Sequence, residues 1–205
     1  MEKTRFYYLN LPDGFKQKKI IDAKDKKTAV IFTLLSFVLA VVVIVLLLLI
    51  KKYDFNKLLE NRSRMLLADL AFLASLIIYI ILHELTHGIG FLLFTREKLK
   101  FGMTLTVAYC GVPSAYVKKW PAFITTLLPF FVYSALFLLL VFLSTNIYIE
   151  IIAILLFGFH FGGCVGDLYV ASYLIFKADK TTVMNDDGAK QVFYSLSQEK
   201  EELNA

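Results

Sequence analysis

Long uncharged apolar runs are the feature that most constrains how this 205-residue chain can fold. Residues 29–50 carry no charged side chain over 22 positions, and residues 121–149 carry none either. Residues 70–82 are uncharged, and residues 151–166 hold only the titratable His160. Because a helix needs about 20 mostly apolar residues to cross a bilayer, runs of this length predict membrane helices.

The sequence therefore predicts an all-α membrane protein with one compact integral membrane domain over residues 1–177. Hydrophobic residues make up 58% of the chain, whereas a soluble domain is nearer half apolar. About four transmembrane helices are expected, near residues 29–50, 66–94, 121–144 and 148–176. Residues 178–205 are expected to be a polar, solvated tail with a short surface helix from Gln191 to Leu203.

The distribution of Lys and Arg predicts the orientation of these helices. With the N-terminus inside, the cytoplasmic segments hold 17 of the 22 basic residues and the outer segments hold 5. The positive-inside rule then places both termini in the cytoplasm of a multi-pass cell-membrane protein. The net charge of +5 is interpreted as contact with anionic lipid headgroups. Nucleic-acid binding is not expected, because no aromatic and basic binding module is visible.

A five-residue motif lies inside the second predicted helix: His83-Glu84-Leu85-Thr86-His87. Histidines at i and i+4 stand on one helix face, where their ring nitrogens can hold one zinc ion, and the intervening glutamate can act as a base. A polar cluster at bilayer depth is energetically costly and favours a functional interpretation. Two further readings remain open at this stage, a structural histidine pair and a different metal.

Residues 99–107 alternate between apolar and polar side chains, which is typical of a strand. The segment Tyr109–Pro113 resembles a turn, and Ser114–Val117 is expected to return as a second strand. We therefore expect a short membrane-associated hairpin beside the motif. An exposed edge there could hold an extended peptide by backbone pairing, and an interfacial loop without a binding role is the alternative.

The fourth predicted helix holds four glycines, His160 and Asp167 within ten residues. Counted from the outer ends of their helices, Asp167 falls within roughly 3 Å of the depth of His83 at about 1.5 Å per residue. His160 lies about 7–8 Å higher on the same rise. Depth therefore favours Asp167 as the third metal ligand, with His160 as a neighbour or an alternative ligand. Cys110 and Cys164 are expected to be unpaired thiols.

These residues together predict zinc chemistry. A catalytic zinc takes three protein ligands and leaves one position for water. His83, His87 and Asp167 supply such a set, and Glu84 would serve as general base toward a water that zinc activates. His160 would then orient Asp167 or stabilise the developing oxyanion.

The motif and the later Gly166-Asp167 resemble those of the putative zincin peptidase family of small bacterial integral membrane proteins. More distantly they are similar to the site-2 proteases, which are intramembrane zinc metalloproteases. The resemblance covers about half of the chain and implies His83, His87 and Asp167 as zinc ligands with Glu84 as the catalytic base. In site-2 proteases a glycine follows the aspartate, whereas here Leu168 follows it.

The leading hypothesis is a membrane-embedded zinc metalloprotease that hydrolyses a peptide bond in or near the bilayer. Its partners would be membrane lipid and a membrane-protein or peptide substrate. A metal transporter or sensor is the main alternative, in which Glu84 would be another ligand. No internal repeat of the kind common in transporters is visible. A non-catalytic relative that binds a membrane partner is a third hypothesis.

Overall fold

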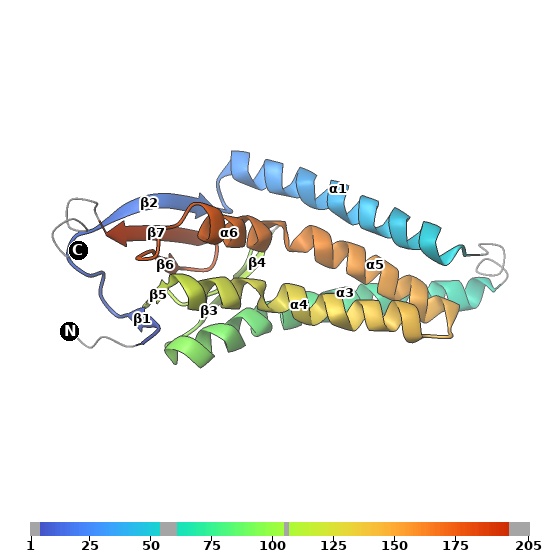
Figure 1. Ribbon diagram of the computed structural model, residues 1–205. Coiled ribbons are helices and arrows are strands. Elements are labelled where there is room, and N and C mark those ends of the chain that lie inside the picture. The colour runs from blue at the N-terminus through green and yellow to red at the C-terminus, as the bar shows by residue number, and fades with distance from the viewer. Residues whose placement is uncertain (1–4, 54–60, 105–106, 197–205) are drawn as a thin grey trace. The chain divides into compact units, whose positions relative to one another are not determined.

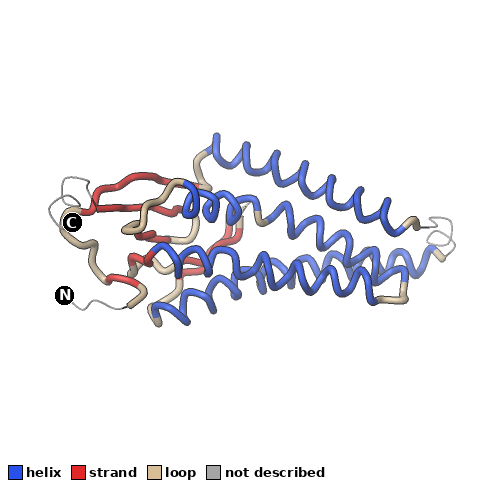
Figure 2. The backbone as a smooth tube through the Cα atoms, in the orientation of Figure 1, coloured by secondary structure: helices blue, strands red, loops and turns tan. Residues whose placement is uncertain are grey.

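The computed structural model describes residues 5–53, 61–104 and 107–196 (Figure 1). Within these residues the chain is mostly helical and also contains short strands. The helices are blue and the strands red in Figure 2. The strands of the described residues come before α1, between α3 and α4, or after α6. The five helices of the described residues are α1 (Lys26–Lys51), α3 (Arg62–Thr95), α4 (Lys119–Leu143), α5 (Ile147–Gly163) and α6 (Val165–Phe176).

The chain divides into two compact units, which are named here by their content. The sheet unit comprises Met1–Val30, His83–Pro129 and Gly166–Ala205. The helix unit comprises Ile31–Leu82 and Phe130–Val165. The helices α3 and α4 contribute residues to both units.

The predicted helices are present, with one difference in the last. Three of them, α1, α3 and α4, are long and apolar enough to cross a membrane. The predicted span 148–176 is interrupted at Cys164, where α5 ends and α6 begins. By length and composition the described residues thus hold three candidate spans, or four if this pair forms one span.

Polar side chains fix where the helices begin. The Asp25 carboxylate accepts a hydrogen bond from the backbone N–H of Thr28 (2.9 Å) at the start of α1. Asn61 and Asn146 cap α3 and α5 in the same way, through bonds from Arg64 N–H (3.0 Å) and Tyr148 N–H (2.9 Å). Each bond satisfies a donor that the first helical turn leaves without a partner.

The core of the helix unit is built by aromatic and aliphatic side chains of α1, α3, α4 and α5. Its buried members are Leu47, Tyr79, Tyr133, Phe137, Val141, Ala153, Ile154, Leu156 and Phe157. Two glycines bring α5 close to α1: a Cβ at Gly158 would lie 2.3 Å from Ile44 Cγ1, and one at Gly162 would lie 2.5 Å from the Ser36 carbonyl oxygen. Small residues permit this kind of close packing between apolar helices.

Many apolar side chains on the outside of these helices are exposed. Phe37 of α1 is 69% exposed and Leu67 of α3 is 67% exposed. Exposed apolar surface of this extent marks a surface that faces lipid or a partner rather than water. It agrees with the composition of a membrane protein.

The sheet unit contains an antiparallel five-stranded sheet in the order β1-β5-β6-β7-β2. Its strands are β1 (Tyr7–Tyr8), β5 (Tyr116–Lys118), β6 (Val183–Asp186), β7 (Lys190–Leu196) and β2 (Phe15–Asp22). The predicted predominance of helices is confirmed, whereas the sequence did not predict this five-stranded sheet. Its physical cause is long-range pairing: β2 near the N-terminus pairs with β7 near the C-terminus, from Phe15 opposite Leu196 to Asp22 opposite Lys190.

The segment predicted as a solvated tail with a surface helix is instead strand over its described part. Met184 and Phe193 are 0% exposed, so β6 and β7 supply core residues of the sheet unit. The expected helix from Gln191 is wrong as far as Leu196, and residues 197–205 lie outside the described part. The polar side chains of β6 and β7 that suggested a tail are half-buried or buried in the fold, and Thr182 and Ser195 are each 1% exposed.

Two short strands pair after α3, and the second is not the return strand that the sequence predicted. The strand β3 (Lys100–Met103) pairs antiparallel with β4 (Ala108–Gly111). The segment expected to be a turn is thus mostly β4, and the residues expected to return form β5 of the five-stranded sheet instead. Residues 105–106, in the connection between β3 and β4, lie outside the described part.

Candidate metal centre

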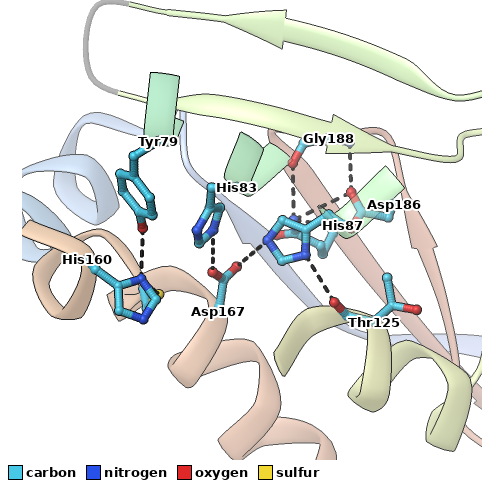
Figure 3. Close-up of polar contacts among 10 residues, drawn as sticks. Tyr79, His83, His87, Thr125, His160, Asp167, Asp186 and Gly188 are labelled. Carbon is cyan, nitrogen blue, oxygen red and sulfur yellow. Dashed lines mark hydrogen bonds and ion pairs between the residues drawn. The ribbon is translucent and has the colours of Figure 1, made fainter. Parts of the chain in front are cut away.

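The end of α3 and the first turn of α6 bring three ligand-type side chains together in the sheet unit. His83 and His87 are one helical turn apart on α3, and each is 8% exposed. The Asp167 carboxylate lies between the two rings (Figure 3). Its Oδ2 is 3.2 Å from His83 Nε2, and its Oδ1 is 3.4 Å from His87 Nε2. The structure thus brings Asp167 of α6 to the histidine pair of α3.

This arrangement fits a tetrahedral metal. Zinc bonds to nitrogen and oxygen of about 2.0–2.1 Å place neighbouring ligand atoms roughly 3.3 Å apart. The two measured separations between imidazole nitrogen and carboxylate oxygen, 3.2 and 3.4 Å, match that value. All three side chains offer ligand atoms within 4.8 Å of one another. Two imidazoles and one carboxylate also form a ligand set that catalytic zinc sites use with one position left open.

The second nitrogen of His87 has a defined partner. His87 Nδ1 lies 3.0 Å from the backbone carbonyl oxygen of Thr125 in α4. A carbonyl oxygen only accepts, so Nδ1 carries the hydrogen and donates it. Such a bond fixes the ring orientation and leaves Nε2 directed at the metal position.

Glu84 lies beside this cluster. Its carboxylate interacts electrostatically with His87, His83 and Asp167, and with the backbone of Cys110 in β4. Among the described residues, Glu84 is in none of the groups whose atoms are close enough to share one metal ion. The side chain is therefore near the metal position without being placed as a ligand.

Two glycines of α3 allow neighbouring elements to approach the motif. A Cβ at Gly88 would lie 2.9 Å from Leu99 Cδ1 and 3.2 Å from Phe101 Cζ. A Cβ at Gly90 would lie 3.2 Å from Thr125 Cα. Gly88 therefore gives room to the chain around β3, and Gly90 gives room to the backbone of α4.

His160, considered from the sequence as an alternative ligand, has partners inside the helix unit. Its Nδ1 lies 2.8 Å from the Tyr79 hydroxyl, and its Nε2 lies 3.1 Å from the Phe130 carbonyl oxygen and 3.0 Å from Ser134 Oγ. Because the carbonyl only accepts, Nε2 carries the hydrogen, and Nδ1 accepts from Tyr79. The ring is 0% exposed, and these bonds satisfy both of its nitrogens.

A buried carboxylate of the sheet unit, Asp186, was not predicted from the sequence. Asp186 ends β6 and is 5% exposed. Its Oδ1 accepts a hydrogen bond of 2.7 Å from the Gly188 backbone N–H, and Gln191 Nε2 lies 3.4 Å away. Burial raises the pKa of Asp186 to about 7, although the bond from Gly188 and the charge of His87 oppose the rise. Only the strand pairing of β6 reveals this residue, since the sequence around it resembles a turn.

The two cysteines are unpaired, as the sequence predicts. Burial, followed by the negative charges of Glu84 and Asp186, raises the pKa of the Cys110 thiol to about 12. The thiol therefore stays protonated at neutral pH in the metal-free protein.

A His-Glu-x-x-His helix faced by a carboxylate from another helix is an arrangement that can hold one metal ion, as in metallopeptidases. Residues 76–182 match the model of the protein family described as "putative zincin peptidase". Because this match covers slightly more than half of the chain, the protein belongs to that family. Membership indicates a metallopeptidase that uses zinc. No curated protein and no solved structure matches the chain.

Proposed function

We propose that this protein is a membrane-embedded zinc metalloprotease that hydrolyses a peptide bond within or beside the bilayer. The observation that carries the proposal is the position of Asp167, whose two carboxylate oxygens face Nε2 of His83 and Nε2 of His87. A structural histidine pair would not need Glu84 beside it, whereas peptide hydrolysis does.

The membrane part of the proposal is supported by α1, α3 and α4, which are long and apolar enough to cross a bilayer. The excess of Lys and Arg in the segments that share a side with the N-terminus supports cytoplasmic termini. A likeness to site-2 proteases is part of the same proposal, since those enzymes also place the motif on a membrane helix.

In the proposed mechanism each side chain has a separate task. His83, His87 and Asp167 hold the zinc, and the Thr125 carbonyl keeps the His87 ring in place. Zinc, when bound, supplies a Lewis acid that polarises the scissile carbonyl and the attacking water. Glu84 accepts the proton of that water and then gives it to the leaving amine. Charge would thus be stabilised by the metal, and Glu84 would transfer the proton.

An extended peptide segment is the proposed form of the substrate. The strand β3 belongs to a two-stranded sheet with β4 among the described residues, and its side chains Phe101 and Met103 are 50% and 79% exposed. An edge strand of this kind can pair with the backbone of a peptide. A membrane protein or peptide with an unwound segment would meet this requirement.

The decisive experiment compares the wild type with Glu84→Gln, which keeps the size of the side chain and removes its basicity. Membranes from cells lacking the protein are incubated with each purified, zinc-loaded form, and new peptide N-termini are identified by mass spectrometry. We expect cleavages with the wild type that fall by at least 100-fold with the variant, the scale of general acid–base catalysis. Zinc content should stay at about one ion per chain in both forms.

Three other outcomes would each reject the proposal in a different way. Equal cleavage by both forms would remove Glu84 from the mechanism. Zinc binding with no cleavage by either form would favour a sensor or a transporter. Flux measurements in liposomes distinguish these two. A wild type without zinc, prepared without chelators, would reject the metal centre itself.

A further inference from the structure

The helix α4 contains a proline in its interior, Pro129. Proline has no backbone N–H, so the carbonyl four residues earlier loses its usual helical partner. In α4 that carbonyl belongs to Thr125. The sequence shows the proline but gives no reason for it.

The structure shows where this carbonyl is used. The Thr125 oxygen accepts the hydrogen of His87 Nδ1 at 3.0 Å (Figure 3). Thr125 is 0% exposed and His87 is 8% exposed, so water does not compete for either group. The carbonyl that Pro129 leaves without an i+4 donor therefore finds its donor in a side chain of the candidate metal centre.

A second observation on α3 supports the same arrangement. The backbone of Thr125 approaches α3 at Gly90, where any Cβ would lie 3.2 Å from Thr125 Cα and 2.9 Å from its Cγ2. Contacts this short leave no room for a larger residue. Gly90 thus permits the close approach, and Pro129 leaves the carbonyl free to use it.

We infer that Pro129 is a positioning residue of the candidate metal centre: by removing the i+4 donor of the Thr125 carbonyl, it makes that carbonyl the acceptor that orients His87. In an uninterrupted helix this carbonyl would point along the axis at the N–H of residue 129. With the N–H absent, the oxygen holds Nδ1–H and directs Nε2 toward Asp167. The inference rests on the proposed metal function of His87.

The test measures zinc affinity by competition with a chromophoric chelator for the full chain in detergent. Pro129→Ala restores the N–H and should weaken zinc binding by about 10-fold, the lower end of what partners of metal-bound histidines contribute. Its cobalt-loaded form should also show a changed visible absorption band, because the geometry of one ligand changes. The thermal midpoint of the metal-free variant should be no lower than that of the metal-free wild type, since alanine is a better helix former than proline.

Two matched changes separate the missing N–H from other effects of proline. Pro121→Ala alters a proline in the first turn of the same helix, where the N–H has no intrahelical acceptor, and should leave zinc affinity within about 2-fold of the wild type, far below the 10-fold scale of a lost histidine partner. Replacing Pro129 by lactic acid, which forms a backbone ester without N–H, should restore the wild-type affinity.

The results distinguish this inference from the proposed function. Wild-type affinity in Pro129→Ala, with zinc bound by both proteins, would overturn the inference and leave the metal centre standing. Equal weakening by alanine and by the ester would also overturn it, because the ring and not the missing N–H would then matter. A wild type that binds no zinc would overturn both.

Discussion

At the scale of single residues, the half-buried Asp167 and the buried Asp186 of the sheet unit have different partners. Asp167 faces two imidazole rings at 3.2 and 3.4 Å. Asp186 is bound by a backbone N–H and an amide group, which carry no full charge. Charged neighbours stabilise an ionised carboxylate more than neutral donors do. Asp167 is therefore suited to hold a cation, and Asp186 is suited to close the turn between β6 and β7.

The pKa of Asp186 predicts how its contribution to stability changes with pH. Its folded-state pKa of about 7 lies above the value of about 3.9 in an unfolded chain. The folded state then binds the proton more tightly, so stability falls as pH rises from about 4 toward 7. Asp186→Asn mimics the neutral acid and keeps the oxygen that accepts from Gly188. The thermal midpoint of Asp186→Asn minus that of the wild type, both measured with chelator present, should increase as pH rises from 5 to 8.

The control for this measurement is the exposed neighbour Asp187, whose side chain is 45% exposed. Asp187→Asn should show a midpoint that follows the wild type across the same pH range. Parallel curves for Asp186→Asn and the wild type would contradict the raised pKa.

At the scale of elements, the packing of α5 on α1 depends on two positions without a side chain. A Cβ at Gly162 would lie 2.5 Å from the Ser36 carbonyl oxygen, which is backbone and has little freedom to move. At the adjacent Gly163 the nearest atom would be 4.0 Å away. A methyl group would therefore clash at Gly162 and fit at Gly163.

Alanine substitutions at these two positions should have opposite effects. Gly162→Ala forces the helices apart and should destabilise the protein by about 1–3 kcal/mol, the usual cost of overpacking. Gly163→Ala should be neutral or stabilising by up to about 1 kcal/mol, because alanine is the better helix former. Thermal unfolding in detergent measures both. Equal midpoints for the two variants would mean that α5 does not lie this close to α1.

At the scale of the whole molecule, the chain is held together by pairing between its ends as well as by its apolar helices. The strand β7 pairs with β2 along its length and with β6 on its other side. Its Phe193 is 0% exposed and lies 4.7 Å from the Tyr173 ring of α6, measured between ring centroids. A C-terminal strand therefore supports the helix that carries Asp167.

Removing this aromatic side chain should weaken the sheet unit and its metal centre together. Phe193→Ala is expected to lower the free energy of unfolding by about 3–5 kcal/mol and to reduce the zinc content of the purified protein. Phe176→Ala serves as the control, because Phe176 of α6 is 80% exposed and its loss leaves no cavity. A Phe193→Ala protein as stable as the control would show that β7 is dispensable.

The sequence by itself determined those features that depend on neighbouring residues. The length of an uncharged run limits it to a long helix, so α1, α3 and α4 lie where they were predicted. The spacing of His83 and His87 places both rings on one helix face wherever that helix lies. Asp167 was also selected correctly as a neighbour of His83, because counting residues along helices gives their rise along the axis.

Only the tertiary structure decided which distant segments meet. The five-stranded sheet, the burial of Asp186 and the use of the Thr125 carbonyl all depend on contacts between residues far apart in the chain. Strand pairing stabilises β2 and β7 through each other, so neither short polar segment shows the pattern of an independent element. The sequence likewise does not show that the Thr125 carbonyl accepts from His87, because only the packing of α3 against α4 brings that donor to it.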